Sequence, residues 1–430
     1  MVAFWRDPPE FLLALAREHG DVARFRWGRS DEFLLNNPDY TQRVLVTEQR
    51  AFMKGQALQE AKRILGEGLL TSEGELHVRQ RRLLQPFFHQ RRVDTYARTM
   101  VEQAERVSAR WEDGQVVDAH REMARLTLAI VGRTLFDADV EGEAAEIGVA
   151  LTDALDSIKT LMVPGSSALE ALPIPAMRRL RRSRERLDRT IYALLRERRE
   201  NGTGRDDLLS LLVEARDESG AGMSDEQIRD EAMTLFLAGH ETTAAALTWT
   251  WHLLGAHPDV EARLHAEVDA IPAGRSPAIE DLAELRYAHM VLSEALRLYP
   301  PAWIVGRRAL VDFEVGGYVV PARAIVVLSP YVSHRDPRWF PEPDRFDPER
   351  WTDAASGERP RWTYFPFGGG ARTCIGEAFA WTEAKLLLAT LAQDWRLRPV
   401  PGHRVALHPR VTLRPRGGLP VTLERRRPSP

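Results

Sequence analysis

The stretch Phe365-Pro366-Phe367-Gly368-Gly369-Gly370-Ala371-Arg372-Thr373-Cys374-Ile375-Gly376 holds the only cysteine of this 430-residue chain. Three consecutive glycines allow the backbone to turn tightly beside a bulky planar group. The N–H groups that such a turn exposes can hydrogen-bond a thiolate and keep it ionised. A lone cysteine is more often a small buried hydrophobic residue, but this glycine-rich setting favours a chemical role.

Two further features favour a negatively charged sulfur at Cys374. Arg372 places a fixed positive charge two residues before it. The pattern over residues 377–391 predicts a helix, and the dipole at its N-terminus also stabilises a thiolate. The sequence therefore predicts a thiolate that binds a metal.

The pattern Phe367-x-x-Gly370-x-Arg372-x-Cys374-x-Gly376 resembles the haem-binding signature of the cytochrome P450 monooxygenases at all of its defining positions. The resemblance implies that the cofactor is haem b and that Cys374 is the axial ligand of its iron. It also places Phe367 and Arg372 in the cofactor site. A thiolate ligand pushes electron density onto iron and favours cleavage of the O–O bond.

The composition bounds the class of protein. Hydrophobic residues make up 44% and charged residues 28%, which is ordinary for a soluble globular chain. A net charge of −3 argues against nucleic acid as a partner. One cysteine fits a reducing compartment, and no apolar run is long enough for a signal peptide or a membrane anchor. We expect a cytoplasmic monomer without a transmembrane anchor.

The expected fold class is mainly α with small β sheets, in a single P450-like domain over residues 1–430. Helical patterns dominate residues 71–310, and an earlier helix is predicted at 39–46. Residues 313–320 read as a hairpin split by Gly316-Gly317, and 324–328 as a strand. A late hairpin is predicted from 411–413 and 419–422.

A second constellation is Ala238-Gly239-His240-Glu241-Thr242-Thr243, inside a helical pattern over 224–257. Gly239, Thr242 and Thr243 are poor helix formers, so a local distortion is expected there. An acid followed by a hydroxyl can feed protons into a dry cavity.

The P450 resemblance gives each residue of this motif a role. It makes Glu241 the acid and Thr242 the proton-relay residue. Ala238 and Gly239 match small residues that leave room for haem and O₂, and His240 falls at a variable position and is interpreted as structural.

A third motif is Glu294-x-x-Arg297, whose spacing places both side chains on one helix face. Such a pair is usually a surface salt bridge that contributes little stability. The resemblance implies instead a buried structural network of Glu294, Arg297 and Arg350, the last from a proline-rich loop.

The two haem propionates call for nearby cations. His77 and Arg81 match the propionate-binding helix of the family. Arg307 is a third candidate, with Arg308 able to take its place, and Arg372 is a fourth. For any one of these arginines the alternative is an ordinary surface charge.

The substrate is expected to be lipophilic, because the candidate pocket walls are nearly all apolar. They are Leu65, Leu69, Leu235, Ala238, Ala302, Trp303, Ile304 and Thr412. The stretch 297–304 is similar to bacterial members that act on carotenoids, terpenes or fatty acids.

Electrons are expected from a ferredoxin with its NAD(P)H-dependent reductase, because the chain has no flavin domain and no iron–sulfur cysteines. Arg79, Arg82, Arg91 and Arg92 are candidate charges for docking an acidic ferredoxin. Two alternatives are a non-enzymatic haem sensor or carrier, which the Glu241–Thr242 pair argues against, and a cysteine hydrolase, which lacks a motif-linked base.

One basic segment has two interpretations. Residues 177–199 contain ten arginines together with three acidic residues, and Glu200 follows directly. A helix of this kind can lie on a membrane surface. We favour a solvated helix face, because acidic residues at i,i+3 and i,i+4 spacing supply ion pairs.

Overall fold

The structure is a computed structural model that describes residues 4, 6–27, 30–137, 175–201, 207–272, 274–357 and 359–426. Its contacts divide the chain into two compact units. The first comprises Met1–Gly55, Met100–Ala124 and Thr242–Pro430, and the second Gln56–Thr99 and Arg125–Glu241. Helices dominate, so the expected fold class, mainly α with small β sheets, is confirmed. The single-domain assignment stays a prediction.

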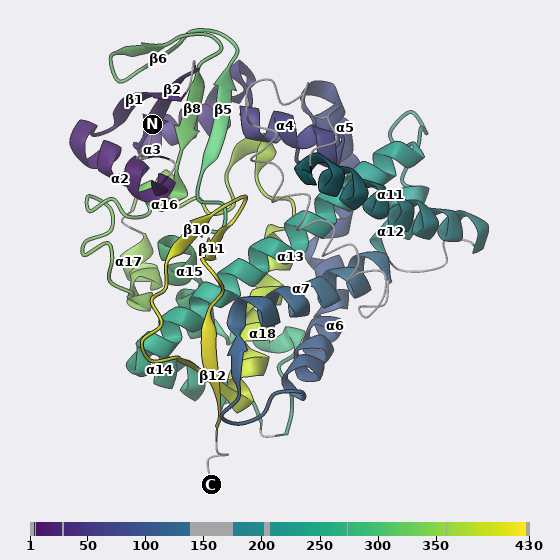
Figure 1. The fold of residues 1–430 in the computed structure, drawn as a ribbon, viewed down its shortest axis with the longest axis vertical. Helices are drawn as coiled ribbons and strands as arrows, with labels where there is room; N and C mark the ends of the chain where they lie inside the picture. The colour runs from purple at the N-terminus through teal and green to yellow at the C-terminus, as the bar shows by residue number, and fades with distance from the viewer. Residues whose placement is uncertain are drawn as a thin grey trace. The chain divides into compact units, whose positions relative to one another are not determined.

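A five-stranded sheet organises the first unit (Figure 1). Its order is β1 (Val22–Trp27), β2 (Ser30–Leu35), β8 (Ile325–Leu328), β5 (Val305–Ala309) and β3 (Phe52–Lys54). Strands β2 and β8 pair in parallel, and the other neighbours pair antiparallel. The sheet therefore brings the N-terminal strands beside segments nearly 300 residues away in sequence.

The middle strand of this sheet, β8, is buried on both faces, because it is apolar at four consecutive positions. Val326 and Leu328 point into a cluster that also contains Phe365, at the start of the cysteine segment. Val327 points into the opposite cluster with Trp303. Successive side chains of a strand alternate between faces, so a continuous apolar run fills both cores.

The rest of the first unit joins helices to small sheets. Helices α14 (Pro258–Val268), α15 (Arg286–Leu298) and α18 (Glu377–Asp394) pack on one another. The predicted hairpin is present as β6 (Phe313–Val315) and β7 (Tyr318–Val320).

The predicted late hairpin is wrong. Strand β11 (Leu413–Pro415) pairs with β10 (Leu407–Pro409), whereas β12 (Pro420–Arg425) pairs with β4 (Val116–Asp118) and β9 (Trp395–Pro399). Gly417 and Gly418 have φ of +77° and +89°, a region that favours glycine. They redirect the chain toward Asp118, whose carboxylate accepts the Leu419 N–H at 2.9 Å.

The described part of the second unit is helical apart from one isolated β-bridge. It contains α4 (Gln56–Leu65), α5 (Gly74–Leu84), α11 (Pro175–Asn201) and α12 (Leu208–Glu214). Three longer helices belong to both units: α6 (Gln90–Ser108), α7 (Ala119–Phe136) and α13 (Asp225–Ala256). In its core the Phe136 and Phe236 rings stack with centroids 4.3 Å apart.

Helix α11 carries the basic segment, and several of its charges are paired within the unit. Asp188 lies 3.9 Å from Arg184 and 2.5 Å from Arg229 of α13. Arg198 is buried, with Asp207 at 3.2 Å and the carbonyl of Phe136 as acceptor. These pairs support the interpretation of an ion-paired helix. Among the described helices, none has the length and apolarity needed to cross a membrane.

Candidate functional site

Cys374 ends a closed loop directly before helix α18. Its N–H donates to the carbonyl of Phe367 at 2.9 Å, and the Thr373 N–H donates to Gly370 at 3.1 Å. Gly368 and Gly370 have φ of +70° and +67°, so the loop uses its glycines for conformations that other residues rarely adopt. The thiol of Cys374 is exposed, which rules out the alternative of a small buried hydrophobic residue.

The other glycines let the loop lie against its neighbours. A Cβ on Gly369 would meet the Trp362 ring at 2.4 Å, and one on Gly370 would meet the Leu45 carbonyl at 2.0 Å. The loop is therefore a fixed backbone cradle that holds an accessible thiol. These features fit the expected haem ligand, since a thiolate must be reachable by the metal and held by its surroundings.

The start of this loop is attached to a buried histidine. His334 is fully buried, and its Nε2 accepts the N–H of Phe365 at 3.0 Å. Burial, aided by the charges of Arg297 and Arg335, holds the pKa of His334 well below its ordinary value. The imidazole is therefore neutral, with Nε2 unprotonated, as an acceptor must be.

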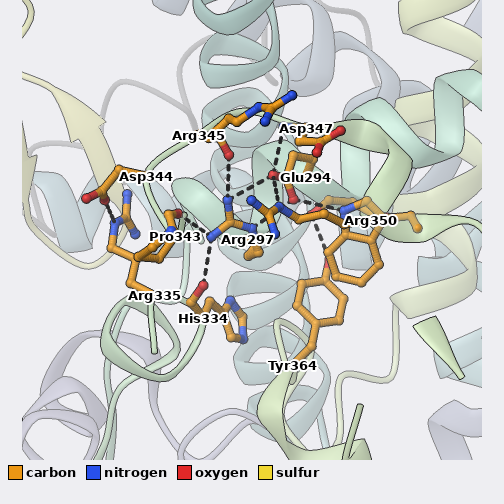
Figure 2. A network of polar contacts seen from close by, with 12 residues as sticks. Glu294, Arg297, His334, Arg335, Pro343, Asp344, Arg345, Asp347, Arg350 and Tyr364 are labelled. Atoms are coloured by element: carbon orange, nitrogen blue, oxygen red, sulfur yellow. Dashed lines mark hydrogen bonds and ion pairs between the residues drawn. The ribbon is translucent and has the colours of Figure 1, made fainter. Parts of the chain in front are cut away.

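The three residues expected to form a network lie together, as Figure 2 shows. Glu294 and Arg297 of α15 are completely buried and pair through two bonds of 2.8 Å. Arg350 reaches the same carboxylate at 3.3 Å. Glu294 also accepts the Asp347 N–H and the Trp351 indole N–H, each at 3.0 Å.

The guanidinium of Arg297 donates all five of its N–H groups. Besides Glu294, it binds the carbonyls of His334, Pro343 and Arg345 at 2.6–3.0 Å. A buried ion pair is favourable only when its remaining hydrogen-bonding groups are satisfied, and here they are. Through His334, this network connects the proline-rich loop with the segment that leads to Cys374.

The motif on helix α13 lies where the helix is accessible. Residues 228–251 are buried except for Ala238, which is exposed, and Gly239 and Thr242, which are half-buried. Ala238 and Thr242 are four residues apart and so share one face. Glu241 is buried at 5% exposure. The helix stays α-helical throughout, so the expected distortion does not interrupt it.

Two residues of this motif have structural partners in the second unit. A Cβ on Gly239 would meet Val131 of α7 at 2.8 Å, so close helix packing explains this glycine. His240 is buried, and its Nδ1 lies 2.6 Å from the carbonyl of Phe236. The backbone carbonyl of His240 accepts a hydrogen bond from the Thr127 hydroxyl. This placement agrees with a structural role for His240.

The candidate propionate ligands belong to different units. In the first unit, Arg307 of β5 is 8% exposed and Arg308 is half-buried, while Arg372 is half-buried in the cysteine loop. In the second, His77 is 6% exposed on α5, and Arg81, one turn later, is half-buried. Burial therefore distinguishes Arg307 from Arg308 and makes an ordinary surface charge a poor description of Arg307.

The candidate pocket-wall residues are also divided between the two units. In the second unit Leu65, Leu69 and Leu235 are buried, and Ala238 is exposed. In the first unit Ala302 is exposed, Ile304 half-buried and Thr412 buried. Trp303 lies in the core cluster beneath the sheet.

Two tryptophans fix the backbone of the loop that carries Thr412. The Trp303 indole N–H donates to the carbonyl of Arg410 at 3.1 Å. The Trp249 indole of α13 donates to the carbonyl of Leu413 at 2.8 Å. The N–H of Leu413 in turn donates to Pro301 at 3.0 Å. These bonds hold the 410–413 loop beside the segment that contains Ala302.

The family model described as "Cytochrome P450" matches residues 1–418. The chain belongs to the cytochrome P450 family. It is 43% identical over 411 residues to cyclooctatin synthase of Streptomyces melanosporofaciens, covering 95% of this chain and 89% of that protein. It is 38% identical over 399 residues to pentalenene oxygenase of Streptomyces avermitilis, covering 92% and 88%.

Solved P450 structures share its fold. The haem domain of cytochrome P450DA matches with a TM-score of 0.90 at 30% identity, covering 98% of this chain and 94% of that one. A retinoic acid-bound cyanobacterial CYP120A1 matches with a TM-score of 0.89 at 25% identity, covering 98% and 96%. This P450 is therefore a haem-binding monooxygenase, an oxidoreductase. The alternatives of a haem carrier and a cysteine hydrolase lose their support.

Sequence reasoning missed three residues that support the cysteine loop of this P450: His334, Trp362 and Gln49. His334 and Gln49 act on the loop from segments distant in sequence, and Trp362 acts from the turn just before it. None belongs to a motif or to a distinctive spacing, so only the folded chain reveals them.

Buried neutral histidines should make the stability of this P450 fall in acid. The pKa of the fully buried His334 is lowered, and burial also lowers the pKa of His265 to about 3. Because an unfolded histidine titrates near 6.5, the unfolded state binds protons first. The free energy of unfolding should therefore decrease as the pH falls below about 6.5.

The variant His334→Gln isolates one of these groups, because glutamine can still accept the Phe365 N–H but does not titrate. We expect the decrease below about pH 6.5 to be shallower by up to about 1.4 kcal/mol per pH unit. The measurement is denaturant unfolding at several pH values. His403→Gln, at an exposed position, is the control. An unchanged slope for His334→Gln would refute the assignment.

Proposed function

We propose that this P450 hydroxylates a lipophilic terpene with O₂, using haem b ligated by the thiolate of Cys374. The observation that carries the proposal is the exposed thiol at the end of a closed glycine loop. When bound, the haem supplies the iron at which O₂ is activated. The Cys374 loop holds the thiolate, and Phe367 lines the site.

The remaining site residues bind, orient or transfer protons. Arg307, Arg372, His77 and Arg81 would neutralise the propionates. The Glu241 carboxyl would supply protons to the Oγ1 hydroxyl of Thr242, which would pass them to O₂ as it is reduced. Ala238 keeps that face of α13 free of a large side chain, and Gly239 lets the helix pack closely on Val131 beside it. Glu294, Arg297 and Arg350 have a structural role.

The terpene class is supported by the relatives. Their names include a cyclooctat-9-en-7-ol 5-monooxygenase, 40% identical over 403 residues, and pentalenene oxygenase. The apolar candidate walls agree with any of the expected carotenoid, terpenoid or fatty-acid classes, and the names of the relatives favour terpenes among them. A panel of cyclic terpenes, fatty acids and carotenoids, screened for the high-spin spectral shift, should give the tightest binding among the terpenes.

We also propose a separate ferredoxin and reductase as electron donors, in keeping with a chain without flavin motifs. Of the suggested docking arginines, Arg79 is paired with Asp217 at 2.6 Å and bound to the Gly222 carbonyl. It therefore has a local structural role. Arg82 and Arg91 are exposed, and Arg82 forms only a loose surface pair with Glu218 at 3.4 Å. These two are the better candidates for steering an acidic partner.

The decisive test is Cys374→Ser. The variant should fold but lose the thiolate, so its reduced carbon-monoxide complex should lack the red-shifted Soret band of thiolate-ligated haem. Ala371→Ser places a hydroxyl at an exposed position of the same loop and should keep that band. Retention of the band by Cys374→Ser would disprove the assignment.

A further inference from the structure

The tip of the Cys374 loop rests on an unusual turn of the N-terminal segment. Helix α3 (Pro38–Gln42) continues into the π-helical turn η1 (Arg43–Thr47). The Leu45 carbonyl of this turn lies against Gly370 so closely that a Cβ there would be 2.0 Å away. Just after the turn, Oε1 of Gln49 accepts the N–H of Ala371 at 3.0 Å.

The turn that presents Gln49 is itself anchored. The Glu48 N–H donates to Arg43 at 2.8 Å, five residues back, and their side chains form an ion pair of 2.5 Å. Leu45 is 2% exposed in the core cluster that also contains Phe365. Phe52, three residues after Gln49, pairs in the sheet through β3. The position of the Gln49 amide is therefore set by the fold.

The loop tip has an open side at this same contact. A surface cavity of about 400 Å³ is lined by Gln42 and Val46, by Trp362 of the opposite segment and by Gly370 itself. Gly370 therefore borders both this cavity and the Leu45 carbonyl. Where packing is incomplete, a single directional hydrogen bond has a larger share in fixing the backbone.

We propose that Gln49 is a positioning residue for Cys374, an inference that rests on the proposed ligation of haem by this cysteine. Gln49 fixes the peptide of Ala371, and the loop transmits that constraint to the glycine turn whose N–H groups are expected to hydrogen-bond the thiolate. Partners of a metal ligand tune the metal through the ligand. Hydrogen bonds to a ligating sulfur influence the reduction potential of the iron, and a well-ordered loop preserves them.

The test is the reduction potential of the haem-loaded protein with Gln49→Leu. Leucine keeps the bulk but removes the acceptor, so the thiolate should lose part of its hydrogen-bond support and donate more strongly to iron. At a fixed potential the ferrous-to-ferric ratio should fall about fivefold, the effect of a net hydrogen bond of about 1 kcal/mol. For a one-electron couple this is a shift of about 40 mV toward negative potential.

A second variant and a control make the result specific. Gln49→Asn moves the acceptor back by one methylene and should shift the potential in the same direction. It provides the test if Gln49→Leu impairs folding. Gln42→Leu changes an exposed glutamine that lines the same cavity, and it should leave the potential unchanged. Equal potentials for the parent and both Gln49 variants would overturn the proposal, and so would an equal shift in Gln42→Leu.

The spectrum of the parent protein distinguishes a failure of the positioning role of Gln49 from a failure of haem ligation by Cys374, on which that role rests. A parent without the Soret band of thiolate haem in its reduced carbon-monoxide complex refutes ligation by Cys374. A parent with that band, together with unshifted Gln49 variants, refutes only the positioning role.

Discussion

Thr242→Ala is expected to separate reductant consumption from product formation. A properly placed proton donor typically contributes about 10²–10⁴-fold to a rate. Thr242 is half-buried on the same face of α13 as the exposed Ala238, directly after the buried Glu241. Without its hydroxyl, electrons should still arrive, but reduced oxygen should leave as peroxide. Haem content and substrate binding should stay close to those of the parent.

The measurement is product formed per NAD(P)H consumed, with peroxide assayed in parallel and with a ferredoxin and reductase added. Thr250→Ala is the matched control, because its buried hydroxyl donates within the same helix to the carbonyl of Ala246 at 2.8 Å. That variant should lose some stability but keep its coupling. If Thr242→Ala forms product as efficiently as the parent, the proton-relay role does not hold.

Glu294→Ala should have the largest effect on stability. Removing one partner of a buried ion pair typically costs about 3–5 kcal/mol, because the remaining charge is left without compensation. Here Arg297 is fully buried and would keep three carbonyl partners but no carboxylate. The N–H groups of Asp347 and Trp351 would also lose their acceptor. We expect little folded, haem-loaded protein.

The control is Glu349→Ala, which removes a carboxylate at an equally short distance but at the surface. Glu349 lies 2.6 Å from Arg263, with side-chain exposures of 47% and 57%. Exposed pairs contribute about 0–1 kcal/mol, so this variant should resemble the parent. Yield, haem content and melting temperature are the measurements. Normal values for Glu294→Ala would show that the network has no structural role.

Local sequence signals predicted much of the fold. The helix predicted for residues 377–391 is α18, the pattern over 224–257 is α13, and the Gly316-Gly317 hairpin is present. The three members of the Glu294 network lie together as the motifs indicated. In each case a period, a turn dipeptide or a fixed spacing carries the information within a few residues.

Other features depend on contacts that the sequence does not display. The segment 39–46 reads as one helix, but only Pro38–Gln42 is α-helical, and the following π turn supports the cysteine loop. Residues 411–413 and 419–422 have strand composition, yet β11 pairs with the preceding β10, and β12 pairs with the distant β4 and β9. Trp303, a candidate pocket wall, lies in a core cluster, and an apolar side chain suits both places, so that assignment stays a prediction.

The indole hydrogen bonds of Trp249 and Trp303 indicate which residues of this region should be kept, and which can be varied, when the substrate selectivity of this enzyme is engineered. Both side chains hold the backbone of one loop, so exchanging them would change the shape of the support itself. In the described contacts, the side chains of Val411, at 44% exposure on that loop, and of the exposed Ala302 do not hold the loop backbone. Libraries that diversify these two positions and retain both tryptophans can therefore explore new selectivities on an intact scaffold.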